Sequence, residues 1–328
     1  MLKTDPILTT LARCVRRLLI VLVLLACPLL QASAVAATTC TLTGPALTFG
    51  TINVFSASNT SGNATFKCSS TAGVKTIRAC LSIGTGTGGT TPGNRTLKSG
   101  INTIPIQITG GVGWPPQIGD GTSFAMEGVV TFVVPAGGNA SYTLPLAIAL
   151  PAPVPLPPPG IYSSSFTGTN FQVYWDTNSY ATCPALVSGT GRAPASGTLT
   201  VSATVVSQCS VTAGNLNFGT ASVLTSPLSA TAAISVNCNA AIPVTVALDN
   251  GATGTGPTTR LMTAGPKTVQ YGIYKDAAHA QPWGATVGSN TGAVNGPSGS
   301  LTAYGSVPAQ TSPAPGSYAD VVNVTATY

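Results

Sequence analysis

One sequence pattern occurs twice in this chain of 328 residues, and the repetition restricts the fold to a pair of related domains. The pattern runs from Cys40 through eight residues to a Phe-Gly pair ending at Gly50, and recurs from Cys209 to Gly219. Later landmarks keep the same order in both copies. Two domains of ordinary size therefore account for most of the chain. The further paired positions are Cys68 and Cys238, Arg95 and Arg260, Trp114 and Trp283, and Tyr162 and Tyr318.

Short stretches of alternating apolar and polar residues predict strands in both copies. Charged residues make up only 6% of the chain, and helical spacing is almost absent. Glycine, proline and asparagine separate the stretches, which is typical of turns. The sequence therefore predicts an all-β fold in which each copy is a sandwich of two antiparallel sheets. The expected strands include 101–109, 129–134, 166–175, 244–248, 269–274 and 321–328.

Residues 1–37 have the features of a signal peptide. Four basic residues precede an apolar run over 18–30, and small residues then offer cleavage sites up to Ala37. A membrane anchor is the alternative, but this run is shorter than the roughly 20 residues that a spanning helix needs. Cys27 also lies in a stretch like a lipoprotein cleavage site, although the apolar run continues beyond it to Leu30. We expect cleavage near Ala37 and export.

The charge balance argues against a nucleic-acid partner. After removal of the leader, nine basic and six acidic residues remain. The basic residues are scattered along the chain and form no run that would follow a phosphate backbone.

Six cysteines follow the leader, and an even number in an exported chain predicts disulfides. The repeat spacing predicts the pairs Cys40 with Cys68 and Cys209 with Cys238, each worth roughly 2–4 kcal/mol. Cys80 and Cys183 have no counterparts in the second copy and would pair by elimination. A zinc site is disfavoured, because the chain has one histidine and no Cys-x-x-Cys pair after the leader.

A strand lies between the two copies, over residues 198–206. Its apolar residues alternate with Thr and Ser, which indicates a strand with one buried face. We expect this strand to complete the first copy. The expected division is a leader over 1–37, a first domain over 38–195, a connecting strand over 196–207 and a second domain over 208–328. The internal closing residues are Leu199, Val201, Ala203 and Val205.

The Cys-x8-Phe-Gly opening, the Arg-x-Leu/Met segment and the closing Pro-Gly-x-Tyr with its terminal strand resemble the spore coat protein U domain family. This is the pilin family of archaic chaperone-usher pili, and the resemblance spans both copies. It implies immunoglobulin-like sandwiches that lack their last strand, which the amino-terminal extension of a neighbouring subunit supplies. Two domains imply a tip adhesin that acts in attachment and biofilm formation. The implied partners are a periplasmic chaperone, an outer-membrane usher, an adjacent pilin and an abiotic or host surface.

The second copy ends in an alternating stretch with no strand after it. We expect this stretch to form one wall of an acceptor groove. Cleavage near Ala37 would leave only Thr38 and Thr39 before Cys40, too little for a donor strand. One acceptor and no donor predict a place at the distal end of the pilus, outside the cell. The terminal acceptor residues are Val322, Val324, Ala326 and Tyr328.

Two apolar loops of the first copy are candidates for adhesion, because exposed apolar patches mark binding sites. One is glycine-rich, over 110–121; the other is a proline-rich insertion over 136–158. Core packing is the alternative for Trp114, and a further strand is the alternative for 144–150. The candidate residues are Val112, Trp114 and Ile118 in the first loop and Leu146, Ile148, Leu150, Val154 and Leu156 in the insertion.

Catalytic residues and cofactor motifs are not evident. His279 lies in a loop-like stretch without a serine or carboxylate motif, and nothing in the sequence brings Asp120 to Glu127. We expect neither enzyme activity nor a cofactor. The alternative function is a secreted β-sandwich carbohydrate-binding module or hydrolase, which would be a stable monomer without a chaperone.

Overall fold

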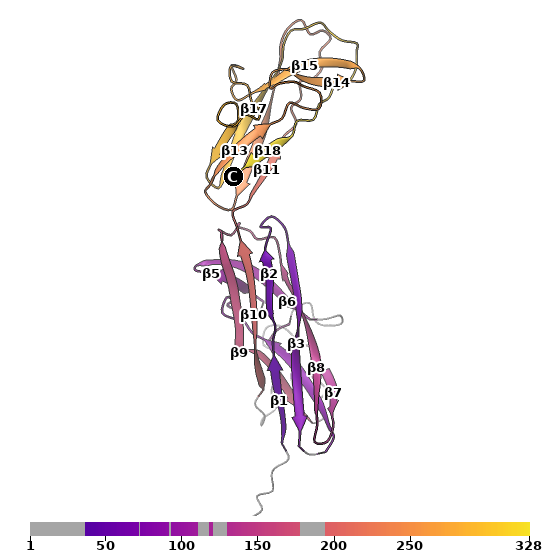
Figure 1. The fold of residues 1–328 in the computed structure, drawn as a ribbon, viewed down its shortest axis with the longest axis vertical. Helices are drawn as coiled ribbons and strands as arrows, with labels where there is room; N and C mark the ends of the chain where they lie inside the picture. Colours follow the sequence, from indigo (N-terminus) through magenta and orange to yellow (C-terminus); the bar gives the residue numbers. More distant parts are fainter. Residues whose placement is uncertain (1–36, 72, 92, 111–117, 121–129, 178–193) are drawn as a thin grey trace, which may run out of the picture.

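The computed structural model describes residues 37–71, 73–91, 93–110, 118–120, 130–177 and 194–328. These residues form strands and turns, arranged as two domains that follow one another along the long axis (Figure 1). The predicted all-β class with two immunoglobulin-like sandwiches is confirmed. No helix within the described ranges is long and apolar enough to cross a membrane.

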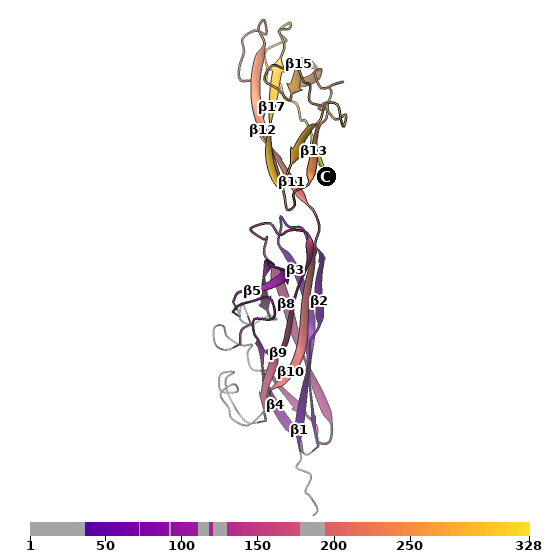
Figure 2. The ribbon, with the colours of Figure 1, turned by 90° about the vertical axis from the view of Figure 1, so that its left-hand side faces the viewer.

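The first domain wraps one continuous network of strands around its core. The order β1-β3-β8-β6-β5-β9-β10-β2 curls so that the β1-β3-β8-β6 part faces the part around β9, to which β4 and β7 add. Figure 2 shows the long strands β3, β9 and β10 running along the length of the domain. The strands are β1 (Thr38–Thr43), β2 (Ala46–Thr51), β3 (Ser58–Ser70), β4 (Lys75–Ile83), β5 (Arg95–Ser99), β6 (Asn102–Thr109), β7 (Val130–Val134), β8 (Asn139–Leu150), β9 (Gly160–Asp176) and β10 (Ala195–Val205).

The second domain has two separate sheets. One has the order β11-β12-β17-β15-β14 and the other only β16-β13-β18. Its own core lies between them, around Trp283, whose Nε1 donates to the Val246 carbonyl at 3.0 Å. The strands are β11 (Cys209–Ala213), β12 (Leu228–Cys238), β13 (Pro243–Leu248), β14 (Arg260–Ala264), β15 (Lys267–Tyr274), β16 (Gly292–Asn295), β17 (Ser298–Val307) and β18 (Val324–Thr327).

Disulfides join the first strand of each domain to the strand that pairs with it. Cys40 is bonded to Cys68 and Cys209 to Cys238, as the repeat spacing predicts. Cys80 is also disulfide-bonded. Cys183, its expected partner, lies outside the described residues.

The repeated arginine is a buried anchor for backbone carbonyls in both domains. Arg260 is fully buried and donates to the carbonyl oxygens of Asp249 at 2.6 and 2.8 Å, Pro257 at 2.6 Å and Trp283 at 2.9 Å. Arg95 likewise donates to backbone carbonyls. Burial lowers the pKa of Arg95 to about 10, although the charge of Asp120 opposes the shift. The Arg-x-Leu/Met pattern is therefore structural.

Three candidate adhesive residues of the insertion are wrong. Leu146, Ile148 and Leu150 are at most 2% exposed. They belong to β8, which pairs with β3 along its full length and turns alternate residues into the core. The proline-flanked apolar stretch is thus a core strand.

Ile118 is also wrong as an adhesive residue, because it is fully buried. Its amide donates to the Ile108 carbonyl at 3.0 Å, and its own carbonyl accepts from Arg95 Nη2 at 2.7 Å. These two bonds hold the residue against the core. Val112 and Trp114, from the same loop, lie outside the described residues.

Candidate functional site

The last strand of the first domain, β10, fills the space between two neighbours. It pairs antiparallel with β9, where Val201 lies opposite Ser164, and parallel with β2, where Val201 lies beside Leu47. Both figures of the ribbon show β10 between these strands (Figures 1 and 2). Its core-facing residues Leu199, Val201, Ala203 and Val205 are at most 2% exposed. Burial of each larger side chain is worth roughly 1.5–3 kcal/mol.

The second domain has no strand at the place that β10 fills in the first. Over residues 194–328, all of them described, nothing pairs with the free edge of β18. The counterpart of β2, around Phe218, forms no strand at all, and β18 has 4 residues where β9 has 17. A strand without a partner on one side forms only where the other side holds it. The missing neighbour explains both shortened elements.

An open apolar groove marks the vacant place. It consists of two adjoining cavities of about 460 and 770 Å³, which share Leu216, Phe218, Met262 and Tyr318. Leu216, Phe218, Tyr318, Val322 and Val324 line it and are only half-buried, and Ala326 of β18 packs against the core of the second domain. In the first domain, Tyr162, the counterpart of Tyr318, is fully buried. The groove thus exposes a core surface that β10 covers in the first domain.

Carboxylates hold the wall of the groove that has no strand beside it. The Tyr271 hydroxyl donates to Asp320 Oδ2 at 2.7 Å, and Asp320 Oδ1 accepts from the amides of Ala252 and Val321, each at 2.9 Å. Burial raises the pKa of Tyr271, and the hydrogen bond to Asp320 raises it further. The tyrosine hydroxyl therefore keeps its proton, and the bond, at physiological pH.

Asp249 makes a second such tie. Its Oδ1 accepts from the amides of Gly251 and Asn323, both at 3.0 Å, and its Oδ2 accepts from Asn323 Nδ2 at 2.6 Å. Burial alone would raise the pKa of Asp249, but the hydrogen bonds from Gly251 and Asn323, together with the charge of Arg260, outweigh it and lower the pKa. Asn323 immediately precedes β18, so this carboxylate fixes the start of the groove wall.

The junction between the domains is a set of hydrogen bonds around the second disulfide. Gln208 Oε1 accepts from the Val54 amide at 3.1 Å, and Gln208 Nε2 donates to the Ile52 carbonyl at 2.6 Å. Asn239 Nδ2 donates to the carbonyls of Pro157 at 3.1 Å and Val206 at 2.9 Å. Gln208 and Asn239 adjoin Cys209 and Cys238. The disulfide between these cysteines therefore holds both side chains close together at the junction.

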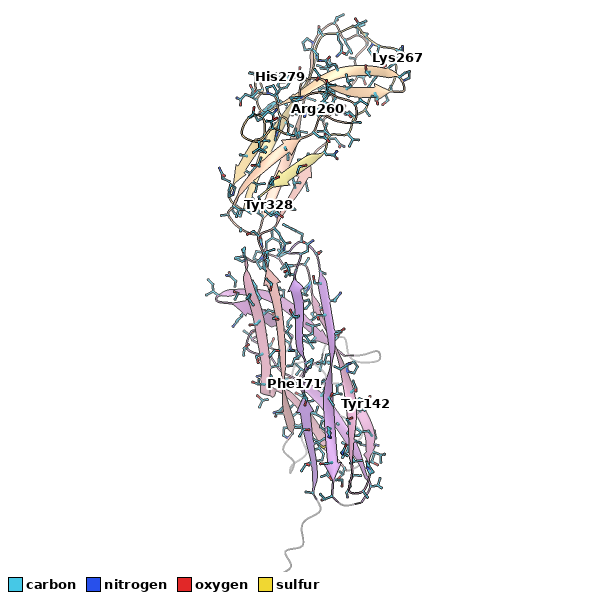
Figure 3. The ribbon with its side chains drawn as sticks, viewed as in Figure 1. Tyr142, Phe171, Arg260, Lys267, His279 and Tyr328 are labelled. Carbon is cyan, nitrogen blue, oxygen red and sulfur yellow. A yellow bond between two sulfur atoms is a disulfide. The ribbon has the colours of Figure 1, made fainter. Side chains whose placement is uncertain are left out.

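The remaining candidate residues are dispersed. Val154 is 90% exposed, whereas Leu156 packs against the first core. Both belong to the segment that Asn239 contacts through Pro157, so they lie at the end of the first domain near the second. Tyr328 is 55% exposed and lies near the junction (Figure 3).

The sequence did not single out the residues that hold the groove and the junction. Tyr271 and Asp320 are 49 positions apart, and only the fold joins them. A signal for the junction does exist. Carboxamides flank the second disulfide, where Thr39 and Ser69 flank the first.

The described polar residues that were considered for catalysis are not gathered into one site. His279 has a positive φ of 54° and contacts the ring of Tyr274, with 5.0 Å between the ring centres. Among the described residues, no group of three or more His, Cys, Asp and Glu side chains is placed to hold a metal ion. Glu127 lies outside the described residues.

Residues 26–169 and 195–325 both match the family model of the Spore Coat Protein U domain. No curated protein matches the sequence significantly. Among solved structures, a chain of the CsuC-CsuE chaperone-tip adhesion subunit pre-assembly complex of Acinetobacter baumannii is 16% identical, with a TM-score of 0.49, over 88% of this chain and 100% of that one. The CupB6 tip adhesin from Pseudomonas aeruginosa is 12% identical, with a TM-score of 0.30, over 89% of this chain and 95% of that one.

Proposed function

This chain belongs to the Spore Coat Protein U domain family, and we propose that it is the tip subunit of an archaic chaperone-usher pilus. In the family, the segment before the first cysteine of a pilin serves a neighbouring subunit. The segment before Cys209 is β10, and in this chain it closes the first domain. The second domain therefore has an open acceptor groove, while the strand that would ordinarily be donated from its start is already in use.

The contrast between the filled and the open groove carries this proposal. In each domain the same family fold leaves one strand position to be filled. In the first domain β10 occupies it with Leu199, Val201, Ala203 and Val205 facing the core, and in the second it stays open between Phe218 and Val324. A bare apolar groove beside a free strand edge is an aggregation hazard. A periplasmic chaperone fills it first, and an adjacent pilin then fills it at the outer-membrane usher by strand addition.

The first domain is the adhesive part under this proposal. Its strand position is filled from within the chain, so it requires no further subunit and lies outermost. It contacts an abiotic or host surface and so promotes biofilm formation. We assign this contact to apolar residues of the first domain. Val112 and Trp114, which lie outside the described residues, remain the candidates, whereas the exposed Val154 lies at the end of the domain near the junction and is not proposed for this contact.

Two matched variants test the acceptor groove. Leu216→Asp places a charge in the apolar groove, while Val287→Asp changes a residue that is 74% exposed and outside it. In cells that produce the chaperone, Leu216→Asp should abolish recovery of the soluble chain, and Val287→Asp should not. Equal recovery of soluble monomer with and without the chaperone, for the unchanged chain, contradicts the proposal.

The position in the fibre is tested by labelling. Ile101 lies at the turn between β5 and β6 and is 98% exposed, so an Ile101→Cys variant carries a gold label without disturbing the core. Labels at one end of each pilus are expected. Labels along the shaft contradict a tip position.

A further inference from the structure

We propose that the free end of the second domain carries a vacant copy of the joint between the two domains, and that this copy receives carboxamide side chains of the next pilus subunit. The proposal rests on the tip function, because it describes how the subunit that fills the groove is oriented. It goes further, since it names a second contact outside the groove and the chemistry of its partner.

The occupied joint supplies the template. The first domain contributes only backbone groups, namely the Ile52 carbonyl, the Val54 amide and the Pro157 carbonyl. The second domain contributes the side chains of Gln208 and Asn239. Because the receiving side is backbone, any segment with the same conformation offers the same hydrogen-bonding groups, whatever its sequence.

The first receiving segment is repeated in the second domain. In the first domain the Gly50 amide donates to Thr48 Oγ1 at 3.0 Å, and in the second the Gly219 amide donates to Asn217 Oδ1 at 2.8 Å. Both glycines have positive φ, 65° and 74°, a backbone conformation that glycine accommodates readily. The backbone segments around Gly50 and Gly219 thus turn in the same way. By repeat register, Ile52 corresponds to Ala221 and Val54 to Val223.

The second receiving segment is repeated as well. The Tyr162 hydroxyl donates to the carbonyl four residues earlier, that of Pro158, at 2.8 Å. The Tyr318 hydroxyl donates to the carbonyl four residues earlier, that of Ala314, at 2.6 Å. The residue before each of these carbonyls is a proline. Pro313 therefore corresponds to Pro157, which accepts from Asn239 in the occupied joint.

The repeated groups are free in the second domain. Ala221, Val223 and Pro313 all line the 770 Å³ part of the groove, and Val223 is 56% exposed. Within the described residues, the Ala221 carbonyl, the Val223 amide and the Pro313 carbonyl accept or donate no hydrogen bond. The chain end at Tyr328, which follows β18, lies near the junction (Figure 3). The segments with these groups precede β12 and β18, and therefore lie at the other end of these strands, away from the first domain.

The groups define their partner. An acceptor at Ala221 beside a donor at Val223 matches one carboxamide, which donates through nitrogen and accepts through oxygen. The partner side chains must also flank a disulfide, as Gln208 and Asn239 do. A second copy of this chain does not fit, because its first disulfide is flanked by Thr39 and Ser69. Their short hydroxyls already bond to each other at 2.9 Å. The partner is a different pilin with carboxamides before its first cysteine and after its second.

Site-specific photo-crosslinking in pilus-producing cells tests the proposal. The full chain carries p-benzoylphenylalanine at Val223 for the joint or at Phe218 for the groove, and crosslinked peptides are identified by mass spectrometry. The Val223 probe should capture residues adjacent to the first or second cysteine of the neighbouring pilin. The Phe218 probe should capture the segment before that first cysteine.

The two probes separate the two claims. If the Phe218 probe captures a pilin and the Val223 probe captures nothing, or only the donated segment, the joint is wrong and the tip function stands. If neither probe captures a pilin, both are wrong.

A backbone variant covers the case in which the bulky probe disturbs the loop. Val223→Pro removes the amide hydrogen that the joint needs, and Val223→Ala keeps it. Loss of one hydrogen bond corresponds to roughly fivefold weaker retention of the tip on sheared pili. The proline variant should show this loss and the alanine variant should not. Equal retention in both contradicts the joint.

Discussion

Val201 is the residue whose replacement most directly tests the role of β10. It lies in the middle of the strand, is fully buried, and has partners on both sides, Ser164 in β9 and Leu47 in β2. Val201→Ala removes two methyl groups from this position, which should destabilise the first domain by about 2 kcal/mol. Val201→Asp also brings a carboxylate into a fully buried position, and should cost several kcal/mol.

Thr200→Asp is the matched control, because Thr200 is adjacent in the same strand but exposed. It introduces the same charge on the opposite face, where the cost should stay within about 0.5 kcal/mol. If Val201→Asp lowers the stability of the first domain much more than Thr200→Asp does, the cause is the burial of the charge and not the low strand propensity of aspartate.

Hydrogen exchange of the chaperone-bound chain is the suitable assay, because it reports each domain separately. For Val201→Asp, faster exchange is expected in β9 and β2, while β12 and β17 keep their protection. Unchanged exchange in β9, or an equal effect of Thr200→Asp, would refute the view that β10 closes the first domain. Faster exchange throughout both domains would refute their independence.

Three further predictions concern the second domain and the junction. Tyr271→Phe removes the hydrogen bond to Asp320 and should lower stability by about 1–2 kcal/mol, seen as faster exchange in residues 318–323 of the chaperone-bound chain. The folded pKa of Asp249 lies below its ordinary value of 3.8, so its contribution is complete above that pH and is lost as pH falls through the folded value; the protection of amides around Asn323, relative to their intrinsic exchange rates at each pH, should therefore fall in acid, and Asp249→Asn should abolish that pH dependence. Gln208→Ala should widen the distribution of interdomain distances, measured by spin labels on the two domains, without changing the stability of either; an unchanged distribution means that the joint is not held by this side chain.

The repeat explains why so much of the fold can be predicted from the sequence. Two copies with paired cysteines define the strands that the disulfides join, and strict alternation in residues 198–206 identifies a strand with one buried face. The buried Arg260 could be placed only as a landmark, because its partners are backbone carbonyls that carry no residue signature.

The errors have a common physical cause. Leu146, Ile148 and Leu150 alternate as a strand should, but alternation does not say whether the apolar face meets a core or solvent. The pairing of β8 with β3 decides this, and the three residues are 84 to 92 positions from their partners in β3. Ile118 has no local pattern at all, because Arg95 and Ile108 hold it from elsewhere in the chain. Sequence patterns report local conformation, whereas exposure depends on distant neighbours.

The occupied groove and joint of the first domain also set the register expected in the second. The last buried residue of β10, Val205, lies four positions before Cys209, and the joint residue Gln208 lies one position before it. Only two residues separate the last buried residue of the strand from the joint residue. A strand bound in the correct register therefore also places the carboxamide at its site. If the next pilin binds in the same way, its core-facing residues lie ten, eight, six and four positions before its first cysteine. A strand shifted by one residue would turn its polar face to the groove, and one shifted by two would bury apolar residues but move the carboxamide by roughly 7 Å. The groove alone would accept a strand shifted by two residues, because apolar side chains still face the core. The joint would not, because the carboxamide no longer reaches its hydrogen-bonding groups. The combination selects one register, which neither contact achieves alone.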